Sequence, residues 1–236
     1  MESTYRALAE RVVDLYKRKQ HTRSTPESAL PGSERVLVAL AGPPGSGKTT
    51  IAVNIVRALT DLPSPPKTVA VSVDGFHLPL AALRELPNSD EAIARRGAPW
   101  TFDAKSAVEM VRNLKTSAGS KAVTIPTFDH AVKDPVADGL VVDPGVQVCI
   151  LEGNYLLCDE GSWSEIADIV DERWLVKVDE NLARSRVASR HLRAGIEPTM
   201  KLALARTDYN DIPNGRYIME HSAGRYDVQV ESIQEN

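Results

Sequence analysis

The sequence predicts an α/β fold in which a mainly parallel sheet is covered by helices on both faces. Short segments rich in valine, isoleucine and leucine alternate along the chain with longer segments of helical periodicity. The short segments are almost uninterrupted by polar residues, which is typical of strands that are buried on both faces. Because strands that alternate with helices usually pair in parallel, this order indicates a helix-covered parallel sheet.

The amino-terminal part is predicted to be a helix followed by a linker. Residues 3–19 show apolar side chains at helical spacing, and residues 21–34 are polar and contain two prolines. We therefore expect residues 1–34 to form a helical extension and residues 35–236 to form the main domain. The apolar stripe of the extension contains Ala7, Leu8, Val12 and Leu15.

The main domain contains five predicted strands and four predicted helices. The strands are the apolar runs at 35–41, 68–74, 121–126, 146–152 and 173–179. The helices are expected at 48–59, 103–114, 164–170 and 180–195. Asp103 is expected to cap the start of its helix, because a carboxylate can accept hydrogen bonds from the free N–H groups there. Gly195 is expected to terminate the last of these helices.

The composition indicates a cytoplasmic protein. The chain has 236 residues and a net charge of -4, which argues against non-specific attraction to nucleic acid or to an anionic membrane. No apolar run approaches the ~20 residues that a membrane span needs, and the first residues lack a signal-peptide core. Cys149 lies in an apolar run and is expected to be a buried, reduced thiol. A homodimer is left open.

A phosphate-binding loop is the most specific motif. Residues 42–49, Gly-Pro-Pro-Gly-Ser-Gly-Lys-Thr, match G-x-x-x-x-G-K-[ST] at every fixed position. Gly45 and Gly47 can adopt the backbone angles that turn successive N–H groups toward a polyphosphate, and the following helix adds its positive dipole end. Lys48 is expected to reach the β- and γ-phosphates, and Thr49 to bind Mg²⁺. A chance glycine-rich turn is the alternative.

This motif, with its flanking strand and helix, predicts the phosphate-loop NTPase fold with ATP and Mg²⁺ as cofactors. The residues expected to bind the nucleotide are Gly42, Pro43, Pro44, Gly45, Ser46, Gly47, Lys48, Thr49 and Thr50.

Two carboxylates stand at the ends of predicted strands. Ligands of parallel sheets lie beyond the carboxyl ends of the strands, so Asp74 should lie near the γ-phosphate, where it can accept a proton from an attacking hydroxyl. A turn cap within "DGFH" is the alternative for Asp74. Glu152 stands where an aspartate usually assists Mg²⁺, and it is expected to bind the metal or to orient the nucleophile.

Five segments in order resemble the phosphoribulokinase/uridine kinase family of phosphate-loop kinases, and within it type I pantothenate kinases, from about Val36 to Arg193. Besides the phosphate loop, the segments are "VDGFH" (73–77), "RRGAPWTFD" (95–103), "IPTFDHAVKDP" (125–135) and "VCILEGNYLL" (148–157). The resemblance implies that Asp74 is the catalytic aspartate. The residues expected to contact the phosphate acceptor are His77, Arg96, Phe128, His130 and Tyr155. Gly75, His77 and Phe102 depart from the family patterns, so the resemblance does not identify the acceptor.

A basic helix follows the last predicted strand. Arg186, Arg190 and Arg193 recur at spacings of four and three, which places them on one face. The resemblance implies that Arg190 and Arg193 belong to a lid that closes over ATP, stabilises the transferring phosphoryl group and excludes water. The alternative is a solvated charged face.

The carboxyl-terminal part gives a weaker signal. Asn210, Asp211 and Asn214 lie beside Pro213 and Gly215, a composition typical of a turn. The functional alternative is that residues 208–228 contact the adenine.

These features predict an ATP-dependent kinase that phosphorylates a hydroxyl of a small metabolite, such as a nucleoside, a pantothenate-like or a sugar-like compound. A GTPase or a nucleotide-binding regulator without phosphotransfer is the alternative. The sequence has no Asn-Lys-x-Asp guanine signature, and it contains all four expected catalytic and metal-binding side chains: Lys48, Thr49, Asp74 and Glu152. With 5% aromatic residues and a net acidic charge, a nucleic-acid-dependent ATPase is disfavoured.

Overall fold

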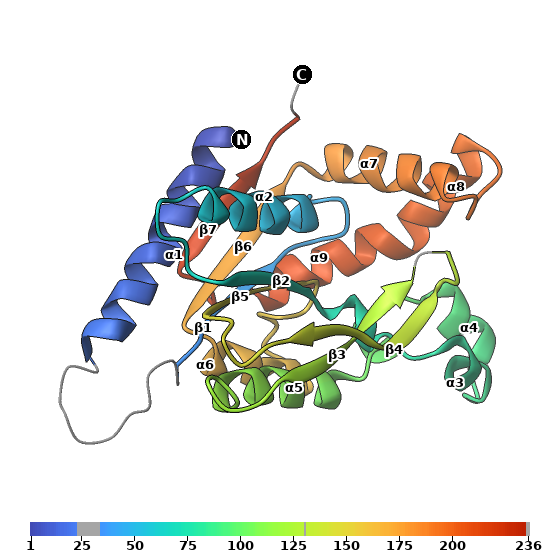
Figure 1. Cartoon of the computed structure of the whole chain (residues 1–236). Coiled ribbons are helices and arrows are strands. Elements are labelled where there is room, and N and C mark those ends of the chain that lie inside the picture. The colour runs from blue at the N-terminus through green and yellow to red at the C-terminus, as the bar shows by residue number, and fades with distance from the viewer. Residues whose placement is uncertain (23–33, 130, 235–236) are drawn as a thin grey trace.

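A parallel sheet of five strands forms the centre of the molecule (Figure 1). The structure, a computed structural model, describes residues 1–22, 34–129 and 131–234. The strand order is β2-β5-β1-β6-β7, and every neighbouring pair is parallel. The strands are β1 (Val36–Ala41), β2 (Thr68–Ser72), β5 (Val148–Gly153), β6 (Glu172–Val178) and β7 (Val228–Ser232). The predicted parallel sheet is confirmed, and β7 is a further strand that the sequence analysis did not identify.

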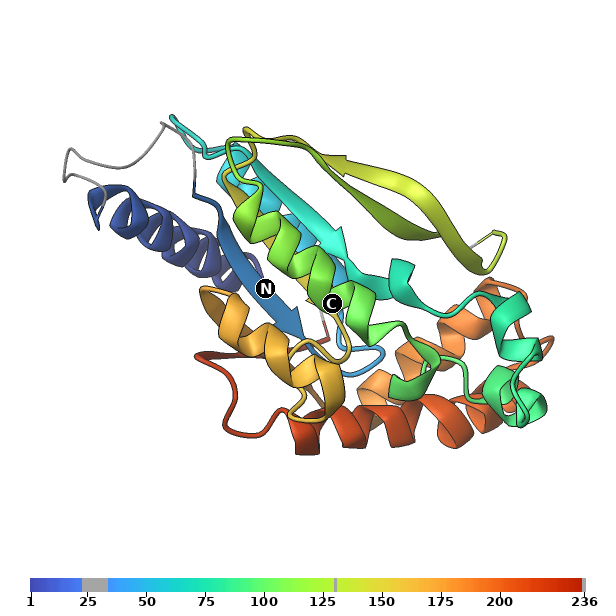
Figure 2. The same ribbon diagram turned by 90° about the horizontal axis from the view of Figure 1, so that it is seen from below.

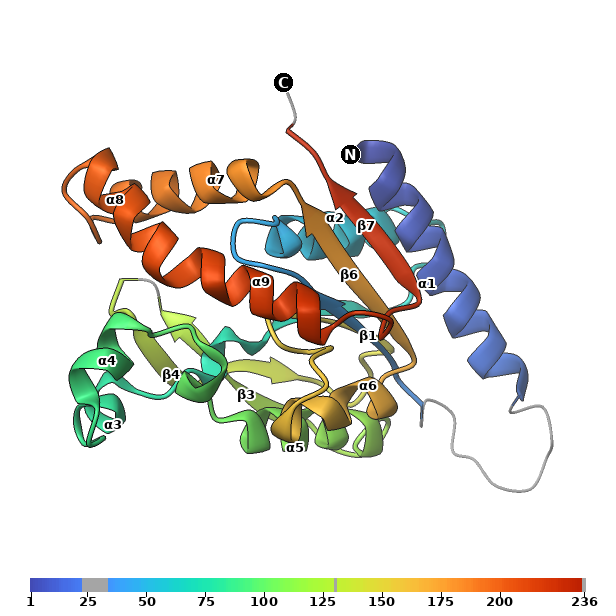
Figure 3. The same cartoon turned by 180° about the vertical axis from the view of Figure 1, so that it is seen from behind.

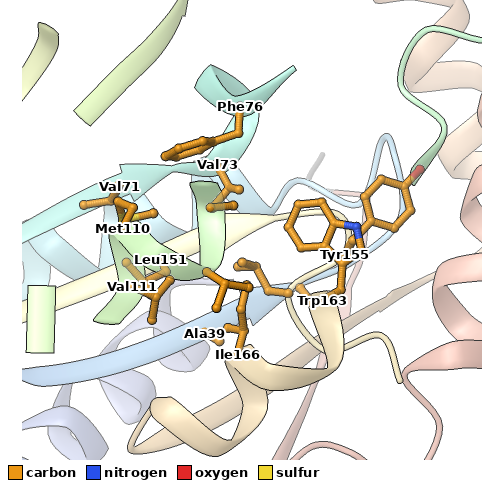
Figure 4. Packing of buried hydrophobic residues seen from close by; sticks show 14 of the residues in the cluster. Ala39, Val71, Val73, Phe76, Met110, Val111, Leu151, Tyr155, Trp163 and Ile166 are labelled. Carbon is orange, nitrogen blue, oxygen red and sulfur yellow. The ribbon is translucent and has the colours of Figure 1, made fainter. Parts of the chain in front are cut away.

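Helices cover both faces of this sheet, as predicted. One face packs against α1 (Glu2–Thr22) and α2 (Lys48–Thr60). The other packs against α5 (Ala104–Thr116), α6 (Ile166–Ile169) and the end of α9 (Ile212–His221). Figure 4 shows this second core, where Val71 and Leu151 of the sheet meet Val111 of α5 and Ile166 of α6. Because strand side chains alternate between the faces, each strand contributes to both cores.

The amino-terminal helix α1 is packed onto the sheet. Its side chains Tyr5, Leu8, Ala9 and Val12 are buried in the same apolar cluster as β1, β6 and α2. Ala7, which the sequence analysis placed in this stripe, is exposed, because the buried face is centred on Leu8 and Val12. The division of the chain at residue 34 stays a prediction, and the predicted linker lies largely outside the described residues.

Two polar contacts hold α1 to β6. Arg11 donates from Nε to Oε1 of the buried Glu172 at 2.6 Å, and Glu172 also accepts the Trp174 indole N–H at 2.8 Å. Lys19 contacts Asp171 at 2.8 Å. These contacts hold the middle and the end of α1 against the sheet.

A hairpin and several short helices lie on the side of the molecule that Figure 2 shows at the right. Strands β3 (Val123–Asp129) and β4 (Asp134–Val142) form an antiparallel pair outside the main sheet. The sequence analysis predicted only a short first strand at 121–126. The short helices are α3 (Leu80–Arg84), α4 (Ser89–Ala94) and 3-10 turns at Val73–Phe76 and Pro99–Thr101. A further 3-10 turn, Gly161–Glu165, leads into α6 and lies beside α5.

Helix α7 (Glu180–Arg193) follows β6 and is succeeded by α8 (Met200–Arg206), a π-helical turn (Thr207–Asp211) and α9 (Figure 3). The prediction of a turn around Asn210 and Asn214 is therefore wrong, because both residues are helical. Pro213 lies in the first turn of α9, directly after the π-helical turn, and the Tyr209 carbonyl four residues earlier accepts a hydrogen bond from Arg95 at 2.6 Å. Gly215 lies inside α9, where a β-carbon would approach Pro43 Cβ to 3.2 Å.

Local predictions about single residues are confirmed. The Asp103 side chain accepts a hydrogen bond from the Ser106 N–H at the start of α5. Gly195 follows α7 with a φ of 61°, a conformation that favours glycine. Cys149 is a buried free thiol, and its burial raises its pKa to about 12. Across the residues that the structure describes, none of the helices combines the length and apolarity that crossing a bilayer would require.

Candidate active site

The predicted catalytic residues meet at the carboxyl edge of the sheet. β1 leads into the phosphate loop, β2 into the turn that carries Asp74, and β6 into α7. Glu152, near the end of β5, pairs in register with Leu40 of β1 on one side and Ser72 of β2 on the other. Because Val148 and Ile150 point to the α2 face, the alternation of side chains directs Glu152 to the same face, where α2 begins.

The phosphate loop has the backbone conformation that its sequence predicts. Gly45 and Gly47 have φ values of 79° and 80°, and helix α2 begins at Lys48. A β-carbon at Gly45 would lie 2.6 Å from the Ala183 carbonyl oxygen of α7. Glycine is therefore needed at this position both for the backbone angle and for the close packing of α7 on the loop.

Lys48 lies between carboxylates and a guanidinium. Burial lowers the pKa of Lys48, whereas the negative charges of Glu152 and Asp74 oppose this shift and Arg190 adds to it. Burial also raises the pKa of Glu152, against the attraction of Lys48 and the hydrogen bonds from Ser72 and Thr49. These four charged groups therefore act on one another, and a bound phosphate chain would favour the charged form of Lys48.

A cavity of about 490 Å³ opens beside the phosphate loop. Arg186, Arg190 and Arg193 line it together with Lys48 and Thr49, so the predicted arginine stripe faces the loop. Arg186 donates to the Gly45 carbonyl at 3.3 Å, to Ser232 Oγ at 2.9 Å and to the Ile233 carbonyl at 2.8 Å. The three arginines share one concave surface with the phosphate loop, but Arg190 and Arg193 are exposed, so the lid and the solvated face both stay predictions.

The cavity also contains residues that the sequence analysis did not consider. Met1 and Tyr5 of α1 and the segment Ser232–Gln234 after β7 lie in its wall. Residues 208–228, proposed above for adenine, do not line it. Neither of these two segments carries a sequence motif. The first reaches the loop because α1 docks on the sheet, and the second because β7 pairs with β6.

Asp74 lies in a 3-10 turn (Val73–Phe76) just beyond β2, which ends at Ser72. The cap of this turn is Ser72, whose hydroxyl accepts from the Asp74 N–H at 3.4 Å. The Asp74 carboxylate is thus not the cap, and it interacts with Lys48 and Glu152. Gly75 is required here, because a β-carbon would come within 2.0 Å of the Pro126 carbonyl oxygen in β3.

Two of the family-like segments lie side by side next to Asp74. The Asp103 N–H donates to the Phe76 carbonyl at 2.8 Å, and the Leu78 N–H to the Thr101 carbonyl at 2.9 Å. The His77 ring packs against two aromatic rings, with centroid distances of 3.9 Å to Phe102 and 5.0 Å to Phe128.

Arg96 is already bound to protein groups. Its guanidinium contacts Asp134 at 2.5 Å and donates to the Leu78 carbonyl at 2.9 Å and the Lys133 carbonyl at 2.5 Å. Its Cζ atom lies 5.4 Å from the centre of the Phe128 ring. Asp134, which the sequence analysis did not single out, lies in the quoted segment 125–135 and also accepts the Leu80 N–H at the start of α3.

Tyr155 is a core residue in this structure. Only 1% of it is exposed, and its hydroxyl donates to the Gly97 carbonyl at 2.5 Å (Figure 4). Burial raises the pKa of Tyr155, so the hydroxyl stays protonated and remains a donor. Asn210 donates to the Arg96 carbonyl at 2.9 Å and so ties the π-helical turn to this segment.

The structure thus brings His77, Arg96, Phe128 and Tyr155 into one region next to Asp74, whereas His130 lies outside the described residues. Their contact with an acceptor stays a prediction.

The oxygen donors near the loop fit Mg²⁺. Thr49 supplies a hydroxyl and Glu152 a carboxylate, and both interact with each other at the start of α2. Within the described ranges, no group of three or more His, Cys, Asp or Glu side chains could hold a metal ion. Mg²⁺ in phosphoryl-transfer sites is commonly held by one or two side chains together with substrate phosphates, which this donor set allows.

Residues 37–193 match the model of the phosphoribulokinase/uridine kinase family. A curated protein of Schizosaccharomyces pombe, named "Putative uridine kinase C227.14", is 37% identical over 216 residues, which is 92% of this chain and 86% of that protein.

Two crystal structures are similar over almost the whole chain. One is described as a "putative fructose transport system kinase" from Silicibacter sp. TM1040, with a TM-score of 0.78 and 31% identity over 95% of this chain and 98% of that one. The other is YFH7 of Saccharomyces cerevisiae, with a TM-score of 0.81 and 21% identity over 98% of this chain and 99% of that one. The second likeness concerns the fold, and it confirms the predicted phosphate-loop kinase architecture.

Proposed function

This chain belongs to the phosphoribulokinase/uridine kinase family, and we propose that it transfers the γ-phosphate of ATP to a hydroxyl group of a small metabolite. The single observation that carries the proposal is the charge arrangement around Lys48. Lys48 interacts with two carboxylates, Glu152 and Asp74, and with Arg190, at the point where the phosphate loop opens into its cavity. A nucleotide-binding regulator without phosphotransfer has no need of a second carboxylate at this position.

Different residues of this chain would bind the phosphates, activate the acceptor hydroxyl and hold the metal. The loop N–H groups and Lys48 would hold the phosphates, and Arg190 and Arg193 would balance the negative charge that spreads over the transferring group. Asp74 would accept the proton of the attacking hydroxyl or orient it for in-line attack. Thr49 and Glu152 would hold Mg²⁺, which neutralises phosphate charge when it is bound.

The acceptor end of the site favours a neutral acceptor rich in hydroxyl groups. Arg96, whose Cζ atom lies 5.4 Å from the centre of the Phe128 ring, is bound to Asp134 and to two carbonyls. It therefore has little capacity left for an acceptor carboxylate. The names of two relatives, "Putative uridine kinase C227.14" and "putative fructose transport system kinase", mention uridine and fructose, which are both neutral and rich in hydroxyl groups. A pantothenate-like acceptor, which is anionic, is the second candidate, carried by the resemblance of residues 95–103.

A panel screen tests the reaction and the acceptor class together. Purified protein would be incubated with ATP or GTP, Mg²⁺ and single acceptors, namely uridine, cytidine, fructose, pantothenate and glycerate, and the products read by mass spectrometry. We expect a mono-phosphorylated product with a neutral acceptor. Lys48→Ala is the control, because removing the loop charge should abolish the product while the fold survives. Nucleotide hydrolysis without any phosphorylated acceptor would support the regulator or GTPase alternative.

The roles of the two carboxylates can be separated with Mg²⁺. Asp74→Asn keeps the size of the side chain but cannot accept a proton, so turnover should fall by ~10²–10⁴ with little change in substrate binding. Glu152→Gln should act mainly through the metal, and raised Mg²⁺ should partly restore its turnover. Normal turnover of Asp74→Asn, or rescue of Asp74→Asn and not of Glu152→Gln, would show that the assignment is wrong.

A further inference from the structure

The amino-terminal helix α1 reaches the nucleotide cavity although the proposed function gives it no role. Met1 and Tyr5 line the cavity beside the phosphate loop. Figures 1 and 3 both show the start of α1 close to the end of β7, whose following residues line the same cavity. The start of α1 and the residues at the end of β7 thus form one wall of the cavity, although they are far apart in the sequence. Neither part belongs to the phosphate loop or to the other family-like segments.

This wall is rigid. Leu8 and Val12 bury the face of α1 against the sheet, and Arg11 binds Glu172 of β6 at 2.6 Å. β6 contacts α1 through its first residue, Glu172, and its other end leads into α7. A ligand between them would meet preformed surfaces on both sides.

The cavity has a charged part and an apolar part. Backbone N–H groups, Lys48 and the α7 arginines suit phosphate. Ile51 and Ile233 cannot bind phosphate, because covering a phosphate with apolar groups would remove its water without replacing the hydrogen bonds, and the Tyr5 ring adds a further apolar surface. The Ile233 side chain is 54% exposed beside this cavity.

Arg186 stands between the two parts. Its guanidinium is held by Ser232 Oγ, the Ile233 carbonyl and the Gly45 carbonyl, and no carboxylate in the described part of the chain pairs with it. A planar guanidinium that is fixed by neutral acceptors and borders apolar side chains is suited to stack against a flat aromatic heterocycle.

We propose that α1, through Tyr5, forms one wall of the subsite for the base of the phosphate donor, with Ile233 as a second apolar wall. This inference rests on the proposed function, in which the donor is a nucleoside triphosphate. Tyr5 then contributes to the affinity for the nucleoside and contributes nothing to the affinity for the phosphate chain. The amino-terminal helix is accordingly part of the enzyme's binding site.

The test compares a ligand that has a base with one that lacks it. Dissociation constants for ATP and for inorganic tripolyphosphate would be measured by calorimetry with Mg²⁺ in the full chain, and their ratio reports the contribution of the nucleoside. We expect Tyr5→Leu, which keeps an apolar side chain, to reduce this ratio about fivefold, since base stacking contributes on that order. Arg6→Ala is the matched control, because Arg6 lies beside Tyr5 in α1 but is exposed and does not line the cavity.

Ile233→Ser serves as a second variant, because this exposed side chain can change without affecting the core. We expect it to lower the ATP affinity about threefold and to leave the tripolyphosphate affinity unchanged. Equal effects of Tyr5→Leu and Arg6→Ala on the ratio, or a wild-type chain that binds both ligands equally, would overturn the inference. If the ratio responds as expected but no acceptor is phosphorylated, the base subsite stands and the proposed transfer reaction fails.

Discussion

The two ends of the candidate active site use positive charge in opposite ways. At the nucleotide end, Arg190 and Arg193 line the cavity, and among the residues described no carboxylate forms an ion pair with either of them. At the acceptor end, the Arg96 guanidinium is bound to Asp134 at 2.5 Å and to two backbone carbonyls. The nucleotide end therefore presents positive charge to a ligand. At the acceptor end, the positive charge of Arg96 holds three segments of the protein together.

This difference indicates how each substrate is selected. A polyphosphate carries several negative charges, and a concave surface of unpaired cations recognises it strongly. At the acceptor end, Arg96 joins the turn after Asp74, the hairpin β3–β4 and the segment before α5. Selection there depends on the shape of that assembly and on its hydrogen bonds, so it should be sensitive to small displacements.

The largest expected effect comes from removing the unpaired cations. The double variant Arg190→Ala, Arg193→Ala should lower turnover by ~10³ or more, because these charges act most strongly when the phosphoryl group is in transit. ATP affinity should fall much less. Steady-state kinetics and calorimetry would measure both. Arg184→Ala is the control on the same helix, since Arg184 is paired with Asp208 at 2.5 Å. Unchanged turnover of the double variant would support the alternative, in which Arg190 and Arg193 belong to a solvated charged face without a role in transfer.

An intermediate effect is expected at the acceptor end. Arg96→Lys keeps the charge but loses the planar fork, so it cannot hold Asp134 and both carbonyls at once. The acceptor KM should rise by roughly tenfold while the ATP dissociation constant stays constant, since only the acceptor segments shift. Arg112→Lys is the matched control, because Arg112 of α5 also pairs with a carboxylate, Glu165, but on an exposed surface. An equal loss of ATP affinity would mean that the two ends are not independent.

The smallest effect is a difference in salt dependence. Raising the ionic strength from about 0.1 M to about 1 M shortens the screening length from about 10 Å to about 3 Å. ATP binding should weaken several-fold over this range, whereas the KM of a neutral acceptor should change by less than about twofold. The Arg190→Ala, Arg193→Ala variant should show a shallower dependence for ATP. A similar salt response of both substrates would contradict the contrast between the two ends.

The nucleotide end could be predicted from the sequence because its signals are local. The glycines of the loop, the lysine at the helix start and the arginines of α7 act through backbone conformation and helical spacing, and neighbouring residues determine both. The positive φ values of Gly45 and Gly47 and the position of the arginines bear this out. The family resemblance predicted the acceptor segments, although it did not show that Arg96 is paired.

The rest depended on contacts between distant residues. The sequence of β4, "DPVADGLVV", contains Pro135 and Gly139 and resembles a loop, but pairing with β3 makes it a strand. Asn210, Asp211, Pro213 and Gly215 favour a turn locally, yet the segment is helical, and Gly215 meets Pro43 of the phosphate loop. Helix α1 gave no functional signal, because Tyr5 reaches the cavity only through docking on the sheet. The likeness to pantothenate kinases within the family stays a prediction.

The order of strands in the sheet has a consequence for how the chain folds during synthesis. β1 lies at the centre, and both of its partners come late, since Val36 pairs with Val148 and Val38 with Glu172. A growing chain therefore carries the phosphate loop long before the strands that flank it have left the ribosome. Pairings of such long sequence separation form slowly, and the unpaired apolar strand is prone to aggregation in the meantime. The nucleotide site needs β6 and its following helix, so ATP can stabilise the protein only after translation has passed β6. Until then, ATP binding cannot protect the unpaired β1 from aggregation.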